Sequence, residues 1–259
     1  MDTALMIRTS ASLLVNMTGI LLFLVAWQVA GASLGDALLA TPLHVAVTLG
    51  DTLLSPDLRA AIAGLLGHMF IGYALSMAIG IPLGVAMGRF SLVRHIVKPW
   101  AQTAVVISAA ALVPLFIILF GRGLLLSVAI VFVSTVWFVA LTMMEAARNV
   151  HPKALAVARS FGASPLQRFR WVMVPALFPY VLVSARIALV QGLRAVVTAQ
   201  MFISSGFGGL INDAGLNIST AALLGLLVIL MLISITLSGI LQFSSNRLAP
   251  WYAAALERP

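Results

Sequence analysis

Residues 123–144 read GLLLSVAIVFVSTVWFVALTMM, a stretch with no charged residue between Arg122 and Glu145. A helix needs about 20 mainly apolar residues to cross the hydrocarbon core of a bilayer. This stretch is long enough, so it predicts one membrane-spanning helix.

Similar uncharged runs continue in both directions along the chain. They lie between Arg8 and Asp36, Arg59 and Arg89, Lys98 and Arg122, Arg194 and Asp213, and Asp213 and Arg247. The composition agrees, because 62% of the residues are apolar, only 8% are charged and the mean hydropathy is +1.12. A soluble domain has about a quarter of its residues charged. We therefore expect an all-α integral membrane protein.

About six membrane-spanning helices are expected, near residues 11–32, 61–88, 100–120, 124–146, 173–203 and 219–243. Residues 1–259 are interpreted as a single transmembrane domain. The first apolar run is too long for the core of a cleaved signal peptide, so we expect it to be retained.

The distribution of Lys and Arg predicts the orientation of the chain. If the N-terminus is cytoplasmic, only Arg59 and Arg122 fall in outer segments, and Arg186 and Arg194 fall within the fifth helix. The inner segments carry the others: Arg8, Arg89, Arg94, Lys98, Arg148, Lys153, Arg159, Arg168, Arg170, Arg247 and Arg258. Basic residues favour the cytoplasmic side, so both termini are expected there.

Several kinds of chemistry are excluded by the residues present. There is no cysteine for a disulfide or thiolate site, and the four histidines show no metal-ligand spacing. Neither Lys98 nor Lys153 follows the glycine that a P-loop requires, and Gly206–Gly209 follows no expected strand. The basic residues form short patches between apolar runs, which indicates a membrane surface rather than nucleic acid. The sequence therefore predicts that this chain is not itself an enzyme.

Three connections between the expected helices carry local signals. Residues 33–60 have Val45, Leu49 and Leu53 at helical spacing and predict an amphipathic interfacial segment. Residues 121–123, Gly-Arg-Gly, leave room only for a tight turn. Residues 204–217 contain four glycines and are interpreted either as an outer hairpin that approaches a partner or as a plain connector.

The inner connection at about 147–172 differs from the rest of the chain, because it carries five basic residues and no acidic one. Residues 153–160 favour a helix, Gly162 predicts its end, and Ser164-Pro165 predicts the start of a second short helix. Such a helix–turn–helix could fit the groove of a soluble partner, or it could be a solvated basic loop near lipid head groups. The spacing alone leaves both interpretations open.

Residues 153–175, KALAVARSFGASPLQRFRWVMVP, resemble the cytoplasmic loop of binding-protein-dependent ABC importer permeases. That signature is Glu-Ala-Ala, three residues, Gly, nine residues, then Ile-x-Leu-Pro. A register that starts at Ala156 places Gly162 and Pro175 correctly, with Ala156 in place of the Glu. The literal Glu-Ala-Ala at 145–147 does not fit, because it puts His and Ser where Gly and Pro are required.

Further phrases are similar to the nitrate, sulfonate, taurine and bicarbonate subfamily of these permeases. They span about residues 40–245, with a core at about 60–245, and comprise GIPLG at 80–84, GR at 88–89, LVPLF at 112–116, FG at 120–121, RSFGAS at 159–164 and RIAL at 186–189. The subfamily often has Glu where this chain has Gln200.

The resemblance implies a type I ABC importer permease fold in a bacterial cytoplasmic (inner) membrane. It also implies a second permease chain, here expected to be identical, and an external substrate-binding protein. A separate ATPase dimer would bind ATP and Mg, and no cofactor is expected in this chain. The alternative function is an ion-coupled secondary transporter without an ATPase, although Glu145 is the only acid near a helix that could serve a proton or sodium relay.

Within this resemblance, the expected ATPase-coupling residues share the inner helix–turn–helix: Ala156, Ala158, Arg159, Phe161, Gly162, Ala163, Ser164, Pro165 and Phe169. Arg186 belongs to a family phrase and is interpreted as structural. Arg194 lies eight residues further, near the same helix face. We hypothesise that Arg194, Gln191 and Gln200 line the path of an anionic solute. The alternative is that Arg194 extends to the outer membrane interface.

Overall fold

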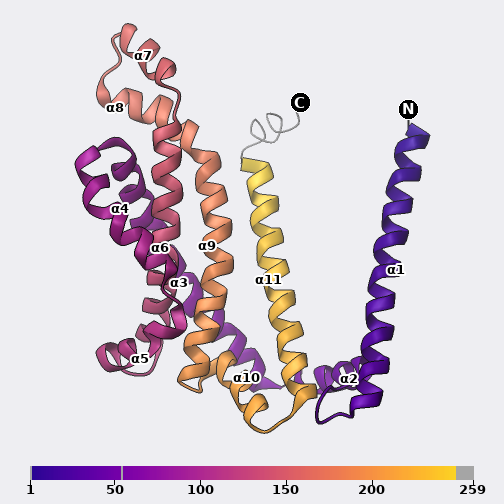
Figure 1. Cartoon of the computed structure of the whole chain (residues 1–259). Coiled ribbons are helices and arrows are strands. Elements are labelled where there is room, and N and C mark those ends of the chain that lie inside the picture. The colour runs from indigo at the N-terminus through magenta and orange to yellow at the C-terminus, as the bar shows by residue number, and fades with distance from the viewer. Residues whose placement is uncertain (1, 54, 249–259) are drawn as a thin grey trace. The chain divides into compact units, whose positions relative to one another are not determined.

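The computed structural model describes residues 2–53 and 55–248, and all regular structure in them is helical. The elements follow in the order α1 (Asp2–Leu34), α2 (Pro42–Leu53), α3 (Pro56–Arg89), α4 (Ser91–Val106), α5 (Ala109–Phe120), α6 (Leu124–Asn149), α7 (Pro152–Ser160), α8 (Pro165–Arg168), the π-helical turn η1 (Phe169–Met173), α9 (Val174–Phe202), α10 (Gly206–Leu216) and α11 (Thr220–Leu248) (Figure 1). The predicted all-α fold is confirmed. Arg258, which the orientation prediction counts, lies outside the described residues.

Five of the six predicted membrane-spanning segments are helices long and apolar enough to cross a bilayer. The prediction of one helix at 100–120 differs from the structure. Two helices, α4 and α5, occupy this region, and the chain bends by 104° between them. Ile107 and Ser108, between them, have extended backbone conformations with ψ of 123° and 136°. The β-branched run Val105-Val106-Ile107 has low helix propensity, which is consistent with a break here. Residues 91–120 therefore form two short helices with a sharp bend between them, and the structure has five such spans, or six if this bent pair is counted as one.

The chain divides into two compact units, of which the first comprises residues 1–60 and 210–230. In this unit the indole N–H of Trp27 donates to the carbonyl of Ala40 at 3.0 Å, and His44 lies 3.0 Å from Asp36. The predicted amphipathic segment is the helix α2. Its residue Val45 is buried with Ala40 and Ala221, and Leu49 packs against this cluster.

The second unit comprises residues 61–209 and 231–259, and α6 lies at its centre. α9 runs beside α6 (Figure 1), and a stripe of small residues on α3 packs against α6 as well. The stripe repeats every four residues: Gly72, Ser76, Gly80, Gly84 and Gly88. Small residues at this spacing let two membrane helices approach closely.

The Gly-Arg-Gly turn is confirmed between α5 and α6, with φ of +71° at Gly121 and +142° at Gly123. Most of residues 204–217 form the helix α10, which connects α9 to α11, so the prediction of a hairpin differs from the structure. Gly206–Gly209 is therefore the start of a helix.

Candidate functional site

The basic connection folds as the predicted helix, glycine turn and second helix. Gly162 has a φ of +76°, in the left-handed region where glycine carries no steric penalty, and its N–H donates to the carbonyl of Arg159 at 2.9 Å. Ser164 and Gln167 then form a reciprocal capping box at the start of α8, with distances of 3.3 and 2.7 Å. We call residues 152–168 the hairpin. These bonds are local, between residues no more than three apart in the chain.

The hairpin is held at its base and exposed at its tip. Leu155 packs against the core of the second unit and Met173, just beyond the hairpin, is buried. At the tip, by contrast, the side chains of Phe161 and Leu166 are 85% and 74% exposed. Phe161 therefore does not anchor the hairpin to this chain, and its ring is free to contact something else.

The predicted coupling residues divide between the two faces of the hairpin. Phe161, Gly162 and Ser164 are exposed near the tip, and Ala158 and Ala163 are half-buried. The remaining four line a hollow on the side that faces α3: Ala156, Arg159, Pro165 and Phe169.

A pocket of about 260 Å³ lies at the break between α4 and α5. Arg194 and Gln191 of α9 both line it, so the structure brings together two of the three residues predicted for a solute path. Arg194 lies eight residues before the end of α9, about 12 Å along the helix axis. It is therefore not at the helix terminus, and it lines a pocket whose walls are both polar and apolar.

The opposite wall of this pocket is the start of α5. Ser108, Ala109 and Ala110 all contribute to it. The first N–H groups of a helix have no partner within the helix, and the helix dipole places partial positive charge there. The hydroxyl of Ser108 makes no capping bond, and the buried hydroxyl of Ser134 on α6 has no hydrogen-bond partner. The start of α5 and the hydroxyls of Ser108 and Ser134 thus line the same pocket as Arg194.

Ser108 and Ser134 were not predicted as site residues. A serine within an apolar run carries no periodic signal, and the break that brings the start of α5 to Arg194 has no Gly or Pro to mark it. The unfilled hydrogen-bonding capacity of these hydroxyls becomes visible only in three dimensions.

Gln200 is the exception among the predicted path residues. Its side chain is 1% exposed, and its Oε1 accepts a hydrogen bond from the backbone N–H of Gly208 at 3.1 Å. Gln200 does not line the pocket with Arg194 and Gln191. It instead joins the end of α9 to the start of α10.

Arg186, interpreted as structural, has a side-chain partner on another helix. Its Nη1 donates to Oε1 of Gln242 on α11 at 2.5 Å. The bond gives the guanidinium a polar partner on another membrane-length helix, which is compatible with the structural interpretation.

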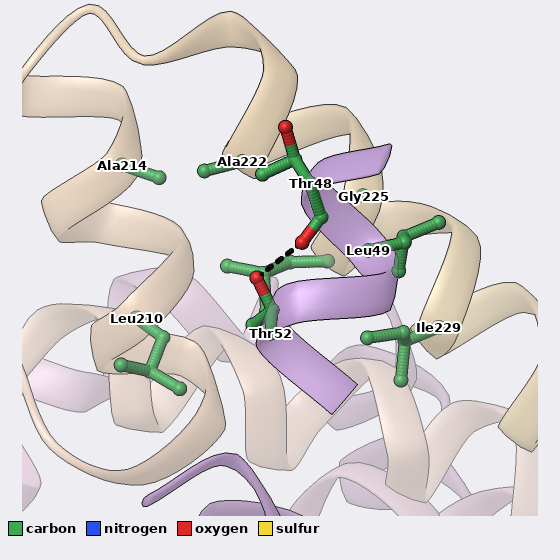
Figure 2. Close-up of a pocket in the computed structure, with 9 residues that line it drawn as sticks. Thr48, Leu49, Thr52, Leu210, Ala214, Ala222, Gly225 and Ile229 are labelled. Carbon is green, nitrogen blue, oxygen red and sulfur yellow. Dashed lines mark hydrogen bonds between the residues drawn. The ribbon is translucent and has the colours of Figure 1, made fainter. Parts of the chain in front are cut away.

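A second pocket, of about 170 Å³, lies in the first unit between α2, α10 and α11 (Figure 2). Its walls are mainly aliphatic, and the hydroxyl of Thr52 donates to the carbonyl of Thr48 on its own helix (Figure 2). No charged side chain lines it. It is therefore poorly suited to recognise an ion. Within residues 2–53 and 55–248, no three His, Asp or Glu side chains are grouped as metal ligands would be.

Membrane-length helices, a bent helix pair with an arginine-lined pocket and a basic hairpin together indicate a membrane transport subunit. A family model described as the binding-protein-dependent transport system inner membrane component matches residues 80–253. The chain belongs to this family.

Relatives with similar sequences carry compatible descriptions. A probable ABC transporter permease protein of Brucella abortus (strain 2308) is 27% identical over 85% of this chain and 89% of its own length. The taurine transport system permease protein of Escherichia coli (strain K12) is 27% identical over 74% of this chain and 70% of its own. The nitrate import permease protein of Leptolyngbya laminosa is 24% identical over 83% and 81%, respectively.

The fold is similar to a solved one. A chain of the MetNI methionine ABC transporter in an inward-facing conformation superimposes with a TM-score of 0.65 at 19% identity, covering 75% of this chain and 95% of the other. The protein is thus a multi-pass inner-membrane permease component of a binding-protein-dependent ABC transporter, and it is a non-catalytic subunit. This family assignment replaces the alternative of an ion-coupled carrier.

Proposed function

We propose that this permease moves a small anionic solute into the cell and that the pocket beside Arg194 is part of its path. The observation that carries the proposal is the convergence of a guanidinium, a helix N-terminus and free hydroxyls on one pocket. All of these groups favour negative charge. The relatives named for taurine, nitrate and bicarbonate transport support the same solute class, since each of these solutes bears a negatively charged group.

The arrangement suits transient binding. In a low-dielectric surrounding, a fixed charge and oriented N–H groups replace part of the hydration shell of an anion. Gln191 adds a neutral amide that can bond to solute oxygens without further charge. A single arginine with neutral donors binds an anion firmly enough to admit it and weakly enough to release it.

Movement of the solute requires an energy source outside this chain. In our proposal the hairpin seats on a separate ATPase dimer, which binds ATP and Mg, and Phe161 and Leu166 enter its surface. The exposure of these two side chains on a hairpin with a glycine turn and a capping box supports this role. ATP-driven movement of two hairpins, one from each of two identical permease chains, would then switch the path between its inward and outward openings.

The proposal includes an orientation. The hairpin and both termini lie in the cytoplasm, and a substrate-binding protein delivers the solute from the other side. The excess of Lys and Arg in the segments assigned to the inside supports this arrangement.

Transport by the reconstituted complex tests the solute path. The companion binding protein is first screened against taurine, nitrate and bicarbonate, and the tightest ligand is used as the transported solute. Arg194→Gln removes one charged donor, and losing such a hydrogen bond costs about 1.5–3 kcal/mol. We expect the solute concentration for half-maximal transport to rise about tenfold or more, with Arg194→Lys intermediate.

Arg186→Gln is the matched control, because it removes an arginine from the same helix that does not line the pocket. Its half-saturating concentration should equal that of the parent. Equal transport by Arg194→Gln and the parent would exclude Arg194 from the path.

A further inference from the structure

A larger hollow, of about 1040 Å³, lies in the second unit between the last turns of α3 and the hairpin. It is separate from the pocket beside Arg194, with which it shares no residue. One wall is formed by residues 81–90 and the other by α7, α8 and the following π-helical turn. The proposed docking of the hairpin on an ATPase gives no role to the side of the hairpin that lines this hollow.

Three arginines line the hollow: Arg89 at the end of α3, Arg159 on α7 and Arg168 on α8. No Asp or Glu lines it, and none of the three arginines has an ion-pair partner among the described residues. The Nε of Arg168 is buried and makes no hydrogen bond. A buried guanidinium donor without a partner is costly, so this site favours an anion.

The rest of the lining is apolar and continues along α3. Ile81, Pro82 and Val85 line the hollow, and Ile81 lies eight residues before Arg89, about 12 Å along the helix axis. Leu155 and Met173 extend this surface on the other wall. The hollow thus has positive charge at the end of a membrane-length helix and an apolar surface that leads toward its middle.

This distribution matches a molecule with an anionic group and a hydrocarbon tail. A small inorganic anion would leave the apolar wall and most of the volume unused. Basic pockets between membrane helices are places where anionic lipid head groups bind. We propose that the hollow binds an anionic phospholipid, with its phosphate among Arg89, Arg159 and Arg168 and its chains along α3.

Ala156 supplies a sharp test, because it lines the hollow and stands where the family signature has Glu. Its small side chain leaves the three guanidinium groups uncompensated. A carboxylate at this position would pair with them and compete with a lipid phosphate. Ala156→Glu should therefore weaken lipid binding, and the neutral Ala156→Gln, of the same size, should not.

The experiment uses the complete permease–ATPase complex in nanodiscs of phosphatidylcholine alone or in equal parts with phosphatidylglycerol. Native mass spectrometry reports the phosphatidylglycerol retained by each complex. One arginine near a membrane surface contributes about 1 kcal/mol to anionic lipid binding, so Arg168→Gln, Arg159→Gln and Ala156→Glu should each weaken retention about fivefold. Arg159 is exposed, so its variant remains informative if Arg168→Gln folds poorly.

Arg170→Gln is the charge control, because it removes an arginine two residues from Arg168 that does not line the hollow. It should retain phosphatidylglycerol as the parent does. If Arg170→Gln and Arg168→Gln lose the same amount of phosphatidylglycerol, the effect comes from general surface charge and the proposal is overturned. Displacement of phosphatidylglycerol by inorganic phosphate would also overturn it, because the site would then bind a free anion. Equal retention of phosphatidylcholine and phosphatidylglycerol by the parent would overturn it as well.

Discussion

Gln200 occupies the junction of α9 and α10, where one amide satisfies a backbone donor in a closely packed region. Its side chain is 1% exposed and accepts from the N–H of Gly208. A Cβ on Gly208 would lie 2.5 Å from the carbonyl oxygen of Val197, so no larger residue fits there without movement. Gln200 is therefore expected to stabilise this junction.

Gln200→Leu keeps a similar volume and removes the acceptor, which leaves the buried N–H of Gly208 unsatisfied. We expect a loss of about 1–3 kcal/mol in stability, measured as a lower midpoint of thermal unfolding in detergent. Gln191→Leu, from the same helix but in the open pocket, should leave that midpoint unchanged. An unchanged midpoint for Gln200→Leu would show that this hydrogen bond contributes little.

The spacing of polar residues in the fifth predicted helix was enough to identify part of the candidate site. Arg194 and Gln191 could be linked from the sequence, because residues three apart share a helix face and an arginine is conspicuous in an apolar helix. Gln200 lies nine residues after Gln191, about half a turn round the helix, so spacing did not link it to the other two. Its burial depends on α10, a helix that four glycines in the segment made hard to predict.

The stripe of small residues on α3 shows how two elements determine each other's position. A Cβ on Gly84 would lie 2.6 Å from Cβ of Met143, and one on Gly88 would lie 2.6 Å from Cβ of Ala147. Between these glycines and Gly72, Ser76 donates to the carbonyl of Gly72 at 2.9 Å and lies within hydrogen-bonding distance of Thr135 on α6. Close packing and the polar contacts of Ser76 with Thr135 and the carbonyl of Phe132 hold the interface.

Gly84→Ala should force α3 and α6 apart. Overpacking of this kind costs about 1–3 kcal/mol, so the midpoint of thermal unfolding should fall. Gly67→Ala is a matched control on the same helix, since a Cβ there meets nothing within 4 Å. It should cause no loss, because alanine favours a helix more than glycine does. Equal midpoints for both variants would contradict the close approach of the two helices.

The hairpin is the element through which we propose that ATP hydrolysis acts. Gly162 has a φ of +76°, which a β-branched residue adopts only under strain of about 1–3 kcal/mol. Gly162→Val should therefore distort the turn, and the ATPase should co-purify with the permease in lower yield. Gly162→Asn tolerates the left-handed conformation and should bind the ATPase as the parent does. Normal co-purification with Gly162→Val would argue against a rigid docking hairpin.

The elements whose ends are set by neighbouring residues in the chain could be predicted from the sequence. The hairpin depends on a glycine turn and a capping box, both of which can be inferred from neighbouring residues. The break between α4 and α5 has no such marker, and residues 100–120 are apolar enough to pass for one helix. Tertiary packing determines whether such a run stays straight.

The orientation of the whole molecule in the membrane is a proposal that the chain makes easy to test. It contains no cysteine, so a single introduced thiol is the only target for a maleimide. Arg122 and Ser160 are both exposed and lie beyond opposite ends of α6, whose 26 residues span about 39 Å. A membrane-impermeant maleimide should therefore distinguish them.

In intact spheroplasts, Arg122→Cys should be labelled, because the positive-inside bias places the turn between α5 and α6 outside. Ser160→Cys should be labelled only after the membrane is permeabilised, since the hairpin must face the ATP of the cytoplasm. The reverse pattern would put the hairpin outside, where no ATPase could reach it. That result would separate the pocket beside Arg194 from its proposed energy source, whatever solute the pocket accepts.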